Sequence, residues 1–325
     1  MAAMSYRTFV GILSMLAFGA GAWACSSSSG SAGASSGQPD ASSGDDASTS
    51  PLDANTGADA PLPVPEGGPA DSGVDGNAAT DGSITNEAGM VLTFSDEFNE
   101  SSSTPDPTKW SYWSIGESTS GPGWGLEYDT PSADVVQNGN LVITATQAAD
   151  GGVLSGSITT KGKFQQTYGH WESSIKVPSG AGTWPAFWLM GDTNGQGWPT
   201  CGEIDIVEVV SPTPQTAYGT IHSGNTSNAS QNTATGGSYK LASGDLSDGY
   251  HLYALDWSKN SIAFSVDGNV YETITPSTVT SGEVWAFDHD FYIIFDLAIG
   301  GSWPGPPNAS TFPATMYVDY VRVYQ

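Results

Sequence analysis

Basic side chains are scarce in this chain of 325 residues, which has 8 Lys and Arg against 34 Asp and Glu and a formal net charge of −26 at pH 7. From residue 91 onward it holds 24 acidic and 7 basic side chains. A surface with this charge repels nucleic acid and other polyanions. The composition therefore excludes nucleic acid as a partner and favours a neutral ligand over an anionic one.

Cysteine is almost absent, because the whole chain has only Cys25 and Cys201 and so cannot carry a framework of disulfides. We expect Cys201 to be a small buried residue, since a nucleophilic thiol needs a paired His. The four His residues lack the spacing of metal ligands. These residues predict no cofactor for catalysis.

The apolar run near the N-terminus is too short for a committed membrane span. Residues 1–25 combine Arg7, this apolar run and small residues before Cys25, which are the parts of a secretory signal. Ala24-Cys25-Ser26 resembles a bacterial lipoprotein cleavage box, although Trp23 is larger than that box prefers. We expect lipidation of Cys25, which would tether a secreted or cell-surface protein to a bacterial membrane. Ordinary signal cleavage nearby is the alternative.

Residues 26–90 contain no aromatic residue, no Lys and no Arg, but ten Asp or Glu. Ser, Gly, Ala, Pro and Asp dominate the segment. It cannot bury enough apolar surface to offset the entropy lost on ordering. We therefore predict a disordered, self-repelling acidic linker over residues 26–90.

Residues 91–325 show no amphipathic helical period of useful length. Short alternating segments separated by Gly, Pro, Asn and Asp predict strands instead. Asp267-Gly268-Asn269 fits a hairpin turn between two of them. The expected strands are 140–146, 170–177, 183–190, 203–210, 217–222, 251–257, 262–266, 270–273, 291–298 and 316–324. This pattern predicts one all-β domain over 91–325 with the architecture of a jelly-roll β-sandwich.

One predicted strand, Glu203-Ile204-Asp205-Ile206-Val207-Glu208, places three carboxylates within six residues. Side chains alternate along a strand, so Glu203 and Asp205 share one face while Ile204 and Ile206 take the other. Strict alternation would turn Glu208 toward the apolar face. One extra residue, a β-bulge near Ile206 and Val207, would return Glu208 to the side of the other two carboxylates.

Three like charges on one face are costly unless they share protons or bind something. A solvated acidic strand is the simplest alternative, but the β-branched residues between the charges indicate that the other face packs into a core. A nearby negative charge raises the pKa of a carboxyl group, so one of the three can hold a proton at neutral pH. An acid beside a carboxylate is the equipment for cleaving glycosidic bonds.

This strand, preceded by Trp198-Pro199 and Cys201-Gly202, resembles the signature of glycoside hydrolase family 16, and in particular of its laminarinase-type endo-β-1,3-glucanases. The resemblance extends from about Thr93 to Gln325. Its other blocks are Phe94-Ser95-Asp96-Glu97-Phe98, Thr160-Lys161-Gly162-Lys163-Phe164, Trp184-Pro185-Ala186-Phe187-Trp188-Leu189-Met190-Gly191, Gly219-Thr220-Ile221-His222, Phe287-Asp288-His289, Gly300-Gly301-Ser302-Trp303-Pro304-Gly305 and Val318-Asp319-Tyr320-Val321-Arg322-Val323-Tyr324.

The resemblance implies a concanavalin A-like sandwich with a concave glycan-binding cleft and a retaining, endo-acting hydrolysis of β-1,3-glucans such as laminarin. It implies that Glu203 is the nucleophile, that Glu208 is the acid/base and that Asp205 hydrogen-bonds the nucleophile. The partner would be a neutral β-glucan, met by a protein that we expect to be a monomer.

Several other residues are candidates for binding the sugar, because a pyranose ring lies flat on an aromatic ring while its hydroxyls need polar partners. Two of them, Trp184 and Trp188, share one face of a predicted strand. Each could equally be a core residue on spacing alone, and His222 could equally be structural. The candidates for substrate binding are Trp124, Trp184, Trp188, His222 and Trp303.

Family members often carry a structural calcium ion far from the cleft, and the corresponding positions here are Glu97, the carbonyl of Gly139, and Asp319. Carboxylate and carbonyl oxygens suit calcium. The alternative is that these are ordinary turn and strand residues. The ion would take no part in catalysis.

Two departures from the family pattern lie on the non-reducing side of the expected glycan. A usual Asn-rich stretch is shortened to Leu126-Glu127-Tyr128, and a common Arg is replaced by Ser157. They leave open a β-1,3-1,4-glucanase or a transglycosylase with the same carboxylates. A non-catalytic β-glucan-binding protein is the alternative of another class.

Overall fold

The computed structural model describes residues 85–86, 88–113, 116–117, 125–193 and 195–325. This part of the chain is built from strands, with two short 3-10 helices, η1 (Pro131–Ala133) and η2 (Ala309–Thr311). Within it, no helix is long and apolar enough to cross a membrane. The predictions for residues 1–25, for most of the linker and for Trp124 lie outside the described residues.

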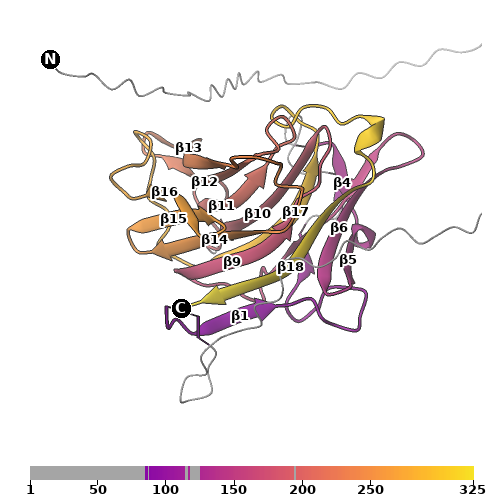
Figure 1. The fold of residues 1–325 in the computed structure, drawn as a ribbon. Coiled ribbons are helices and arrows are strands. Elements are labelled where there is room, and N and C mark those ends of the chain that lie inside the picture. Colours follow the sequence, from indigo (N-terminus) through magenta and orange to yellow (C-terminus); the bar gives the residue numbers. More distant parts are fainter. Residues whose placement is uncertain (1–84, 87, 114–115, 118–124, 194) are drawn as a thin grey trace, which may run out of the picture. The chain divides into compact units, whose positions relative to one another are not determined.

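The larger sheet has eleven strands, and its main path runs β16-β15-β14-β9-β18-β6-β7-β4-β3 (Figure 1). Two further strands join its sides, β1 on β18 and β5 on β6. Its pairings are antiparallel except that between β4 and β7. The strands are β1 (Leu92–Asp96), β3 (Gly116–Glu117), β4 (Glu127–Asp129), β5 (Asp134–Gln137), β6 (Asn140–Gln147), β7 (Val153–Ser155), β9 (Gly169–Lys176), β14 (His251–Ser258), β15 (Ser261–Val266), β16 (Asn269–Ile274) and β18 (Ala314–Tyr324).

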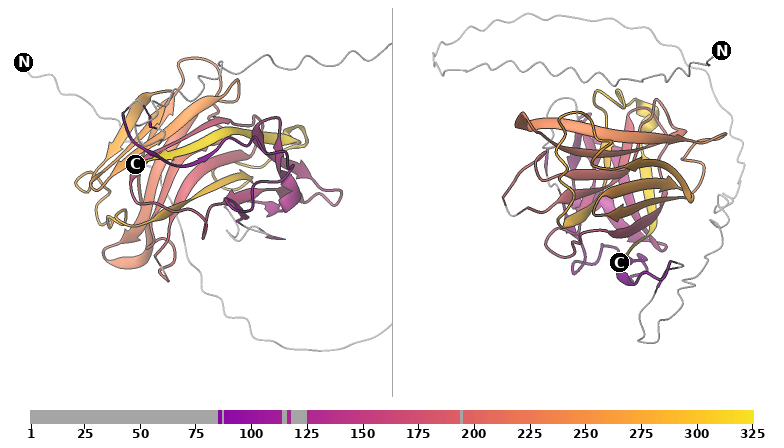
Figure 2. Two further views of the ribbon diagram at one scale, coloured as in Figure 1. Left: turned by 90° about the horizontal axis from the view of Figure 1, so that it is seen from below. Right: turned by 90° about the vertical axis from the view of Figure 1, so that its left-hand side faces the viewer.

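The smaller sheet has seven antiparallel strands in the order β13-β12-β11-β10-β17-β8-β2. Its strands are β2 (Ser111–Tyr112), β8 (Ser157–Thr159), β10 (Thr183–Gly191), β11 (Glu203–Val209), β12 (Thr216–Asn225), β13 (Asn228–Lys240) and β17 (Phe291–Ile299). The strands of both sheets curve strongly, as the two views of Figure 2 show.

A single apolar core lies between the sheets, and the alternation of side chains along each strand explains it. On β10, Phe187 and Leu189 are fully buried in this core, and Phe187 stacks on Phe295 of β17 with ring centroids 4.8 Å apart. Trp184 and Trp188 on the same strand point to the opposite face and are partly exposed. We call that opposite face of the smaller sheet the open face.

Two packed sheets confirm the predicted all-β sandwich, and each of the ten predicted strands is present within a few residues of its expected ends. The hairpin between β15 and β16 is also confirmed. Asp267 and Gly268 both have positive φ, 50° and 75°, as the two central residues of a tight turn between twisted strands require.

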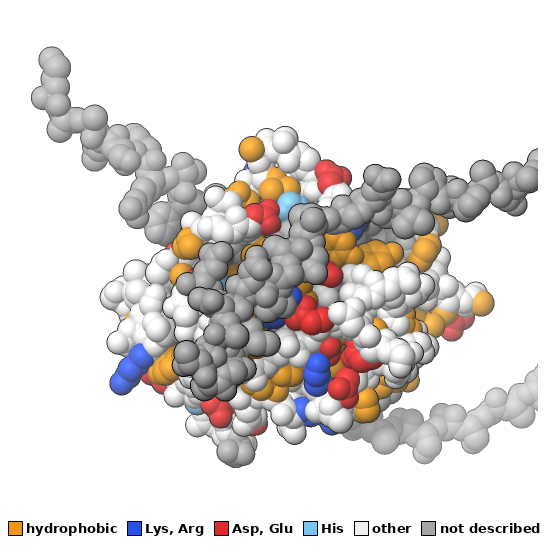
Figure 3. Space-filling view, turned by 60° about the horizontal axis from the view of Figure 1, so that its bottom comes forward, with side chains coloured by type: hydrophobic (Ala, Val, Ile, Leu, Met, Phe, Trp, Pro, Cys, Tyr) orange, Lys and Arg blue, Asp and Glu red, His pale blue; other side chains and the backbone are white. Residues whose placement is uncertain are grey.

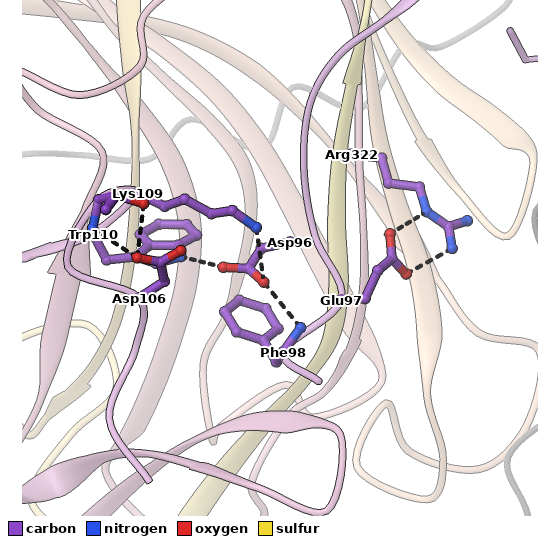
Figure 4. A network of polar contacts seen from close by, with 8 residues as sticks. Asp96, Glu97, Phe98, Asp106, Lys109, Trp110 and Arg322 are labelled. Carbon is purple, nitrogen blue, oxygen red and sulfur yellow. Dashed lines mark hydrogen bonds and ion pairs between the residues drawn. The ribbon is translucent and has the colours of Figure 1, made fainter. Parts of the chain in front are cut away.

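The first strand is held in place by the buried Asp96, which ends β1. Its carboxylate accepts hydrogen bonds from Trp110 Nε1 at 2.7 Å and from the Phe98 amide at 3.0 Å (Figure 4). Lys109 Nζ lies 3.4 Å from the same carboxylate. These contacts satisfy a buried charge and tie the segment after β1 to the core aromatic Trp110.

Acidic side chains are not confined to one place on the surface. On the face seen in Figure 3 they are interspersed with Lys or Arg and with hydrophobic side chains. The functional carboxylates therefore have to be distinguished by their burial and their partners.

Candidate active site

β11 contains the predicted bulge. Across to β12, Asp205 pairs with Thr220 and Glu208 with Tyr218, so three steps along β11 oppose two along β12. Across to β10, the register shifts at the same place, because Val207 pairs with Phe187 and Asp205 with Trp188. Ile206 is the extra residue, and it is buried together with Val207. The predicted irregularity near Ile206 and Val207 is confirmed.

The strand begins after a glycine with a left-handed backbone. Gly202 has a φ of +77°, and a Cβ there would lie 2.9 Å from the Phe291 ring and 3.0 Å from a backbone oxygen. Its carbonyl accepts a hydrogen bond from the Gly191 amide at 3.0 Å. Glycine tolerates this conformation and this close approach, which together fix where Glu203 enters the strand.

Two of the three carboxylates of β11 lie beside one histidine of β12, and the third, Glu208, interacts with the charge of that histidine. His222 Nε2 lies 3.3 Å from Asp205 Oδ2 and 4.0 Å from Glu203 Oε1. His222 Nδ1 lies 3.2 Å from Asn232 Oδ1 on β13. Glu203 and Asp205 share a hydrogen bond between their side chains. The structure therefore brings the predicted catalytic residues and His222 together.

Burial and mutual repulsion raise the pKa of each of these acids. Burial, with the neighbouring charge of Glu203, raises the pKa of Asp205 to about 7. Burial and the charge of Asp205 raise the pKa of Glu208 to about 8. Burial also raises the pKa of Glu203, although His222 opposes the shift. At neutral pH the row can therefore hold a proton on Glu208 beside an ionised neighbour.

His222 behaves in the opposite way. Burial lowers its pKa, but the hydrogen bond to Asp205 and the charges of Glu203, Asp205 and Glu208 outweigh burial and raise it to about 10. The imidazole is therefore a cation at neutral pH, and its Nδ1–H can donate to Asn232 Oδ1.

Donor atoms of Glu203, Asp205 and His222 all lie within 4.8 Å of one another, a spacing that a metal ion can bridge. In the described part of the chain this is the one group of three such donors. A protonated imidazole has no lone pair to offer a metal, so with a protonated His222 the group is an ion-paired cluster of one imidazolium and two carboxyl side chains.

An aromatic corner stands beside Glu208. Trp184 Nε1 donates a hydrogen bond to Glu208 Oε1 at 2.9 Å. The edge of Trp184 meets Trp303 at a centroid distance of 5.4 Å, and Trp303 meets Tyr218 at 5.1 Å. Trp184 and Trp303 are partly exposed, as aromatic walls of a sugar site have to be.

A second aromatic corner surrounds Trp188, whose Nε1 donates to Asp296 Oδ1 of β17 at 2.8 Å. Trp113 contacts Trp188 edge-on at 6.3 Å and lies 5.7 Å from Tyr292. The ammonium of Lys161 sits 5.3 Å from the Trp113 ring and 5.2 Å from the Tyr292 ring. The sequence interpretation found Trp188 but missed the other members of this corner.

Trp198 was also missed as a site residue. Its side chain is 42% exposed, and it hydrogen-bonds Glu203. An exposed indole that contacts a partly buried carboxylate is placed to meet a ligand at that carboxylate. The available signal was a tryptophan in a loop rich in Gly and Pro, the same signal that identified Trp303.

Cys201 is a buried free thiol, as predicted. Burial, with the charge of Glu203, raises its pKa, which makes the thiol unreactive. Its Sγ lies 3.5 Å from Met190 Sδ, and His289 Nε2 lies 3.0 Å from its carbonyl oxygen. His289 therefore has a structural contact.

The two departures from the family pattern lie next to each other. Glu127 is buried, and its Oε2 accepts hydrogen bonds from the amides of Leu126 at 3.0 Å and Ile299 at 2.8 Å. Ser157 is buried on β8 and donates through Oγ to Asp129 Oδ2 at 3.0 Å. Acidic side chains thus surround the position where Ser157 stands in place of a common Arg.

Of the three residues expected to bind calcium, Glu97 directly follows β1, Gly139 lies in the turn between β5 and β6, and Asp319 is on β18. Both oxygens of Glu97 accept from Arg322, at 2.9 and 2.8 Å, so its side chain is taken by an ion pair (Figure 4). Asp319 is exposed at a register shift of β18, and Gly139 lies against Asn99. Asp319 can offer a carboxylate and Gly139 a carbonyl, whereas Glu97 could contribute only its backbone oxygen.

Comparisons with known proteins place this site in context. Residues 125–322 match the family model described as glycosyl hydrolases family 16. The chain is 37% identical over 251 residues to the β-glucanase of Rhodothermus marinus. This alignment covers 72% of this chain and 85% of that protein. It is also 36% identical over 264 residues to glucan endo-1,3-β-glucosidase A1 of Niallia circulans. That alignment covers 73% of this chain and 38% of the relative.

Among solved structures, the laminarinase catalytic domain of Thermotoga maritima superposes with a TM-score of 0.64 and 37% identity. The match covers 72% of this chain and 97% of that domain. Residues 125–322, which match the family model, include strands of both sheets and all of β11. The strand that carries the carboxylates therefore lies within the family domain.

Proposed function

The chain belongs to glycosyl hydrolase family 16 and is a glycoside hydrolase, and we propose that it cuts internal β-1,3 bonds of neutral glucans with retention of configuration. One observation carries the proposal. The extra residue Ile206 turns Glu208 to the same face as Glu203 and Asp205, so a protonated acid and an ionised carboxylate share one site between aromatic side chains.

In the proposed first step the carboxylic acid of Glu208 donates its proton to the glycosidic oxygen while the carboxylate of Glu203 attacks the anomeric carbon. The C–O bond to the leaving sugar breaks and a glycosyl ester forms on Glu203. In the second step Glu208, now a carboxylate, removes a proton from water, and this water attacks the same carbon and releases Glu203.

Asp205 and His222 have positioning roles in this scheme. Asp205 hydrogen-bonds Glu203, and its negative charge keeps the proton on Glu208. The cationic His222 compensates part of the negative charge of the row and favours the ionised form of Glu203. The two charges therefore separate the roles of the two glutamates.

The linkage is supported by relatives named for β-1,3-glucan and by the neutral-ligand preference expected from the charge. A β-1,3-1,4-glucanase is a second candidate, because the departures at Leu126-Glu127-Tyr128 and Ser157 are on the side expected to select the linkage. Product analysis on laminarin and on lichenan separates the two. Transfer products longer than the substrate would instead indicate a transglycosylase.

Azide tests the roles of the glutamates. With an aryl β-glucoside of activated leaving group, Glu203→Ala plus azide should regain turnover and give the α-glycosyl azide. Glu208→Ala plus azide should give the β-azide. A β-azide from Glu203→Ala would reverse the assignment. The absence of reducing-sugar release by the wild type on any glucan would favour a non-catalytic glucan-binding protein.

Three features are proposed separately: a lipid on Cys25 that holds a secreted protein at a bacterial membrane, a monomeric state and a structural calcium. Radiolabelled palmitate should enter the wild type but not Cys25→Ser, and size-exclusion chromatography should give one chain per particle. A calcium ion held by Asp319 and the carbonyl of Gly139 should make the melting temperature fall in EDTA, and Asp319→Asn should abolish that fall.

A further inference from the structure

A row of four side chains crosses the open face from Glu208 to β8. Glu208 pairs with Ala186, Ala186 with Asp296, and Asp296 with Ser157. Ala186 is a small side chain, and it stands between two tryptophans on its own strand. With strands about 4.8 Å apart, Asp296 lies about 10 Å from Glu208 along the row. The row therefore forms a path of small and polar side chains along the open face from Glu208 to Asp296 and Ser157, with one tryptophan on each side of Ala186.

This path ends in three carboxylates around Ser157, which we call the acidic end and define as Asp129, Asp134 and Asp296. Ser157 Oγ donates to Asp129 Oδ2 at 3.0 Å, and the Ser157 amide donates to the Asp134 carboxylate. Asp296 is directly opposite Ser157 in the register and accepts from Trp188 Nε1. Asp129 and Asp134 are 9% and 1% exposed, and Asp296 is partly exposed.

One carboxyl oxygen at the acidic end lacks a hydrogen-bond donor among the described residues. Oδ1 of Asp134 is buried and has no hydrogen-bond partner among the described residues. A Cβ on Gly156 would lie 2.2 Å from that oxygen, so a larger residue there would block it. In the described part of the chain, no Lys, Arg or His forms an ion pair with Asp129, Asp134 or Asp296. Three neighbouring carboxyl groups are costly to bury as anions unless they retain protons or a positive charge joins them.

The arrangement suits an ammonium group better than a metal ion. A metal needs several donor atoms that converge on one point, and in the described residues such convergence occurs only at Glu203, Asp205 and His222. An ammonium needs one or two carboxylate contacts and a surrounding negative field. The neighbouring tryptophans on β10 supply the surface on which a sugar ring carrying that ammonium could lie.

We propose that the acidic end binds the protonated amino group of a 2-amino-2-deoxy sugar, so the enzyme accepts β-glycans with unacetylated amino sugars on the non-reducing side of the cleaved bond. The assignment to a side of the bond rests on the proposed function. The amine recognition rests on the contacts of the acidic end alone.

Direct binding tests the proposal without relying on hydrolysis. Calorimetry at pH 6 would compare a β-linked tetramer of glucosamine with its fully N-acetylated counterpart on the full chain. We expect the free amine to bind at least about tenfold more tightly, with the advantage shrinking as salt is added. Asp296→Asn and, separately, Asp129→Asn should each remove most of that advantage, with melting temperatures checking that both fold.

Asp256→Asn is the matched control, because it removes one carboxylate from an exposed position of β14 in the larger sheet. It should leave the amine preference unchanged. Equal binding of the two tetramers would overturn the proposal, as would a preference that survives in both variants, since the ammonium would then sit elsewhere. Loss of the preference in millimolar magnesium or calcium at constant ionic strength would assign the acidic end to a metal cation instead. Laminarin hydrolysis, measured in parallel, reports separately on the proposed function.

Discussion

Carboxylates are handled in opposite ways beside β9, β14 and β18 of the larger sheet and in the catalytic row on the open face of the smaller one. Beside those three strands they are matched with cations: Glu97 binds Arg322 of β18 through both oxygens, and His170 of β9 lies 2.7 Å from Asp256 of β14. On the open face, Glu203, Asp205 and Glu208 share one histidine among three acids. The ion pairs of the larger sheet stabilise the fold. The crowded acids of β11 instead retain protons that are available for acid catalysis.

The shifts in pKa record the same contrast. Burial lowers the pKa of His170, but its hydrogen bonds to Asp256 and Glu172 outweigh burial and raise it to about 9, so the imidazole is a cation beside those two side chains. Burial raises the pKa of Glu208 instead, and the Asp205 charge adds to the shift. Burial would also raise the pKa of Asp267, but hydrogen bonds from His251 and the Leu252 amide lower it, so this matched acid shifts in the opposite direction from Glu208.

The strongest way to sharpen the comparison is to remove one acid from each region. Glu203→Gln and Glu208→Gln should each lower kcat on laminarin by about 10³-fold or more, because each removes a group that acts in the transition state. Glu172→Gln on the larger sheet should leave kcat within about twofold. A laminarin assay of the three variants is decisive, since comparable losses in all three would mean that only folding is affected.

Removing His222, the cation beside the three acids of β11, should have a smaller effect. His222→Gln keeps a polar side chain but loses the positive charge, so we expect kcat to fall by about 10- to 100-fold. Without the cation, the acids of the row should also hold their protons to higher pH. An upward shift of both limbs of the pH profile would support a positioning role, and an unchanged profile would contradict it.

The pH profile of the wild type offers a third test. Glu208 must be protonated to donate, and its pKa is raised to about 8, so kcat/KM should fall tenfold per pH unit above pH 8. On the acid side, activity should fall as Glu203 gains a proton, and its raised pKa moves this limb above the range of an ordinary glutamate. An alkaline limb near pH 5 would disagree with this environment of Glu208.

Stability should change in opposite directions in the two regions. Glu97→Gln breaks a bidentate ion pair that is partly buried and should cost about 1–2 kcal/mol of the free energy of unfolding. Glu208→Gln should raise the melting temperature relative to wild type as pH rises from about 4.5 to 8. In that range the folded wild type keeps a proton that the unfolded chain releases, so its stability falls with pH. Melting curves at pH 5 and 8 measure both effects.

The sequence predicted the regular part of the molecule well because apolar alternation directly encodes which face is buried. The strand Asn228–Lys240 was missed for the same reason: it is built mostly of Asn, Ser, Thr, Gly and Ala, and most of its residues are exposed. It forms by pairing with β12 over nearly its whole length, which no local pattern reveals.

The site was predictable only where its residues are neighbours in sequence. Glu203, Asp205 and Glu208 lie on one strand, and the bulge that unites them followed from their spacing. Asp296 and Asp134 come from separate strands that meet only through the register of β8 and β17 and the packing around Ser157. Their raised pKa values are products of burial in the folded chain, so the sequence alone gave no sign of the acidic end.

The extra residue at Ile206 makes the length of β11 as consequential as its composition. Deleting Ile206 would keep every acid in the chain, yet it would turn the side chain of Glu208 to the other face of β11, which packs into the apolar core. The deletion of one codon would therefore abolish hydrolysis, and its reinsertion would restore hydrolysis, with all three catalytic carboxylates unchanged.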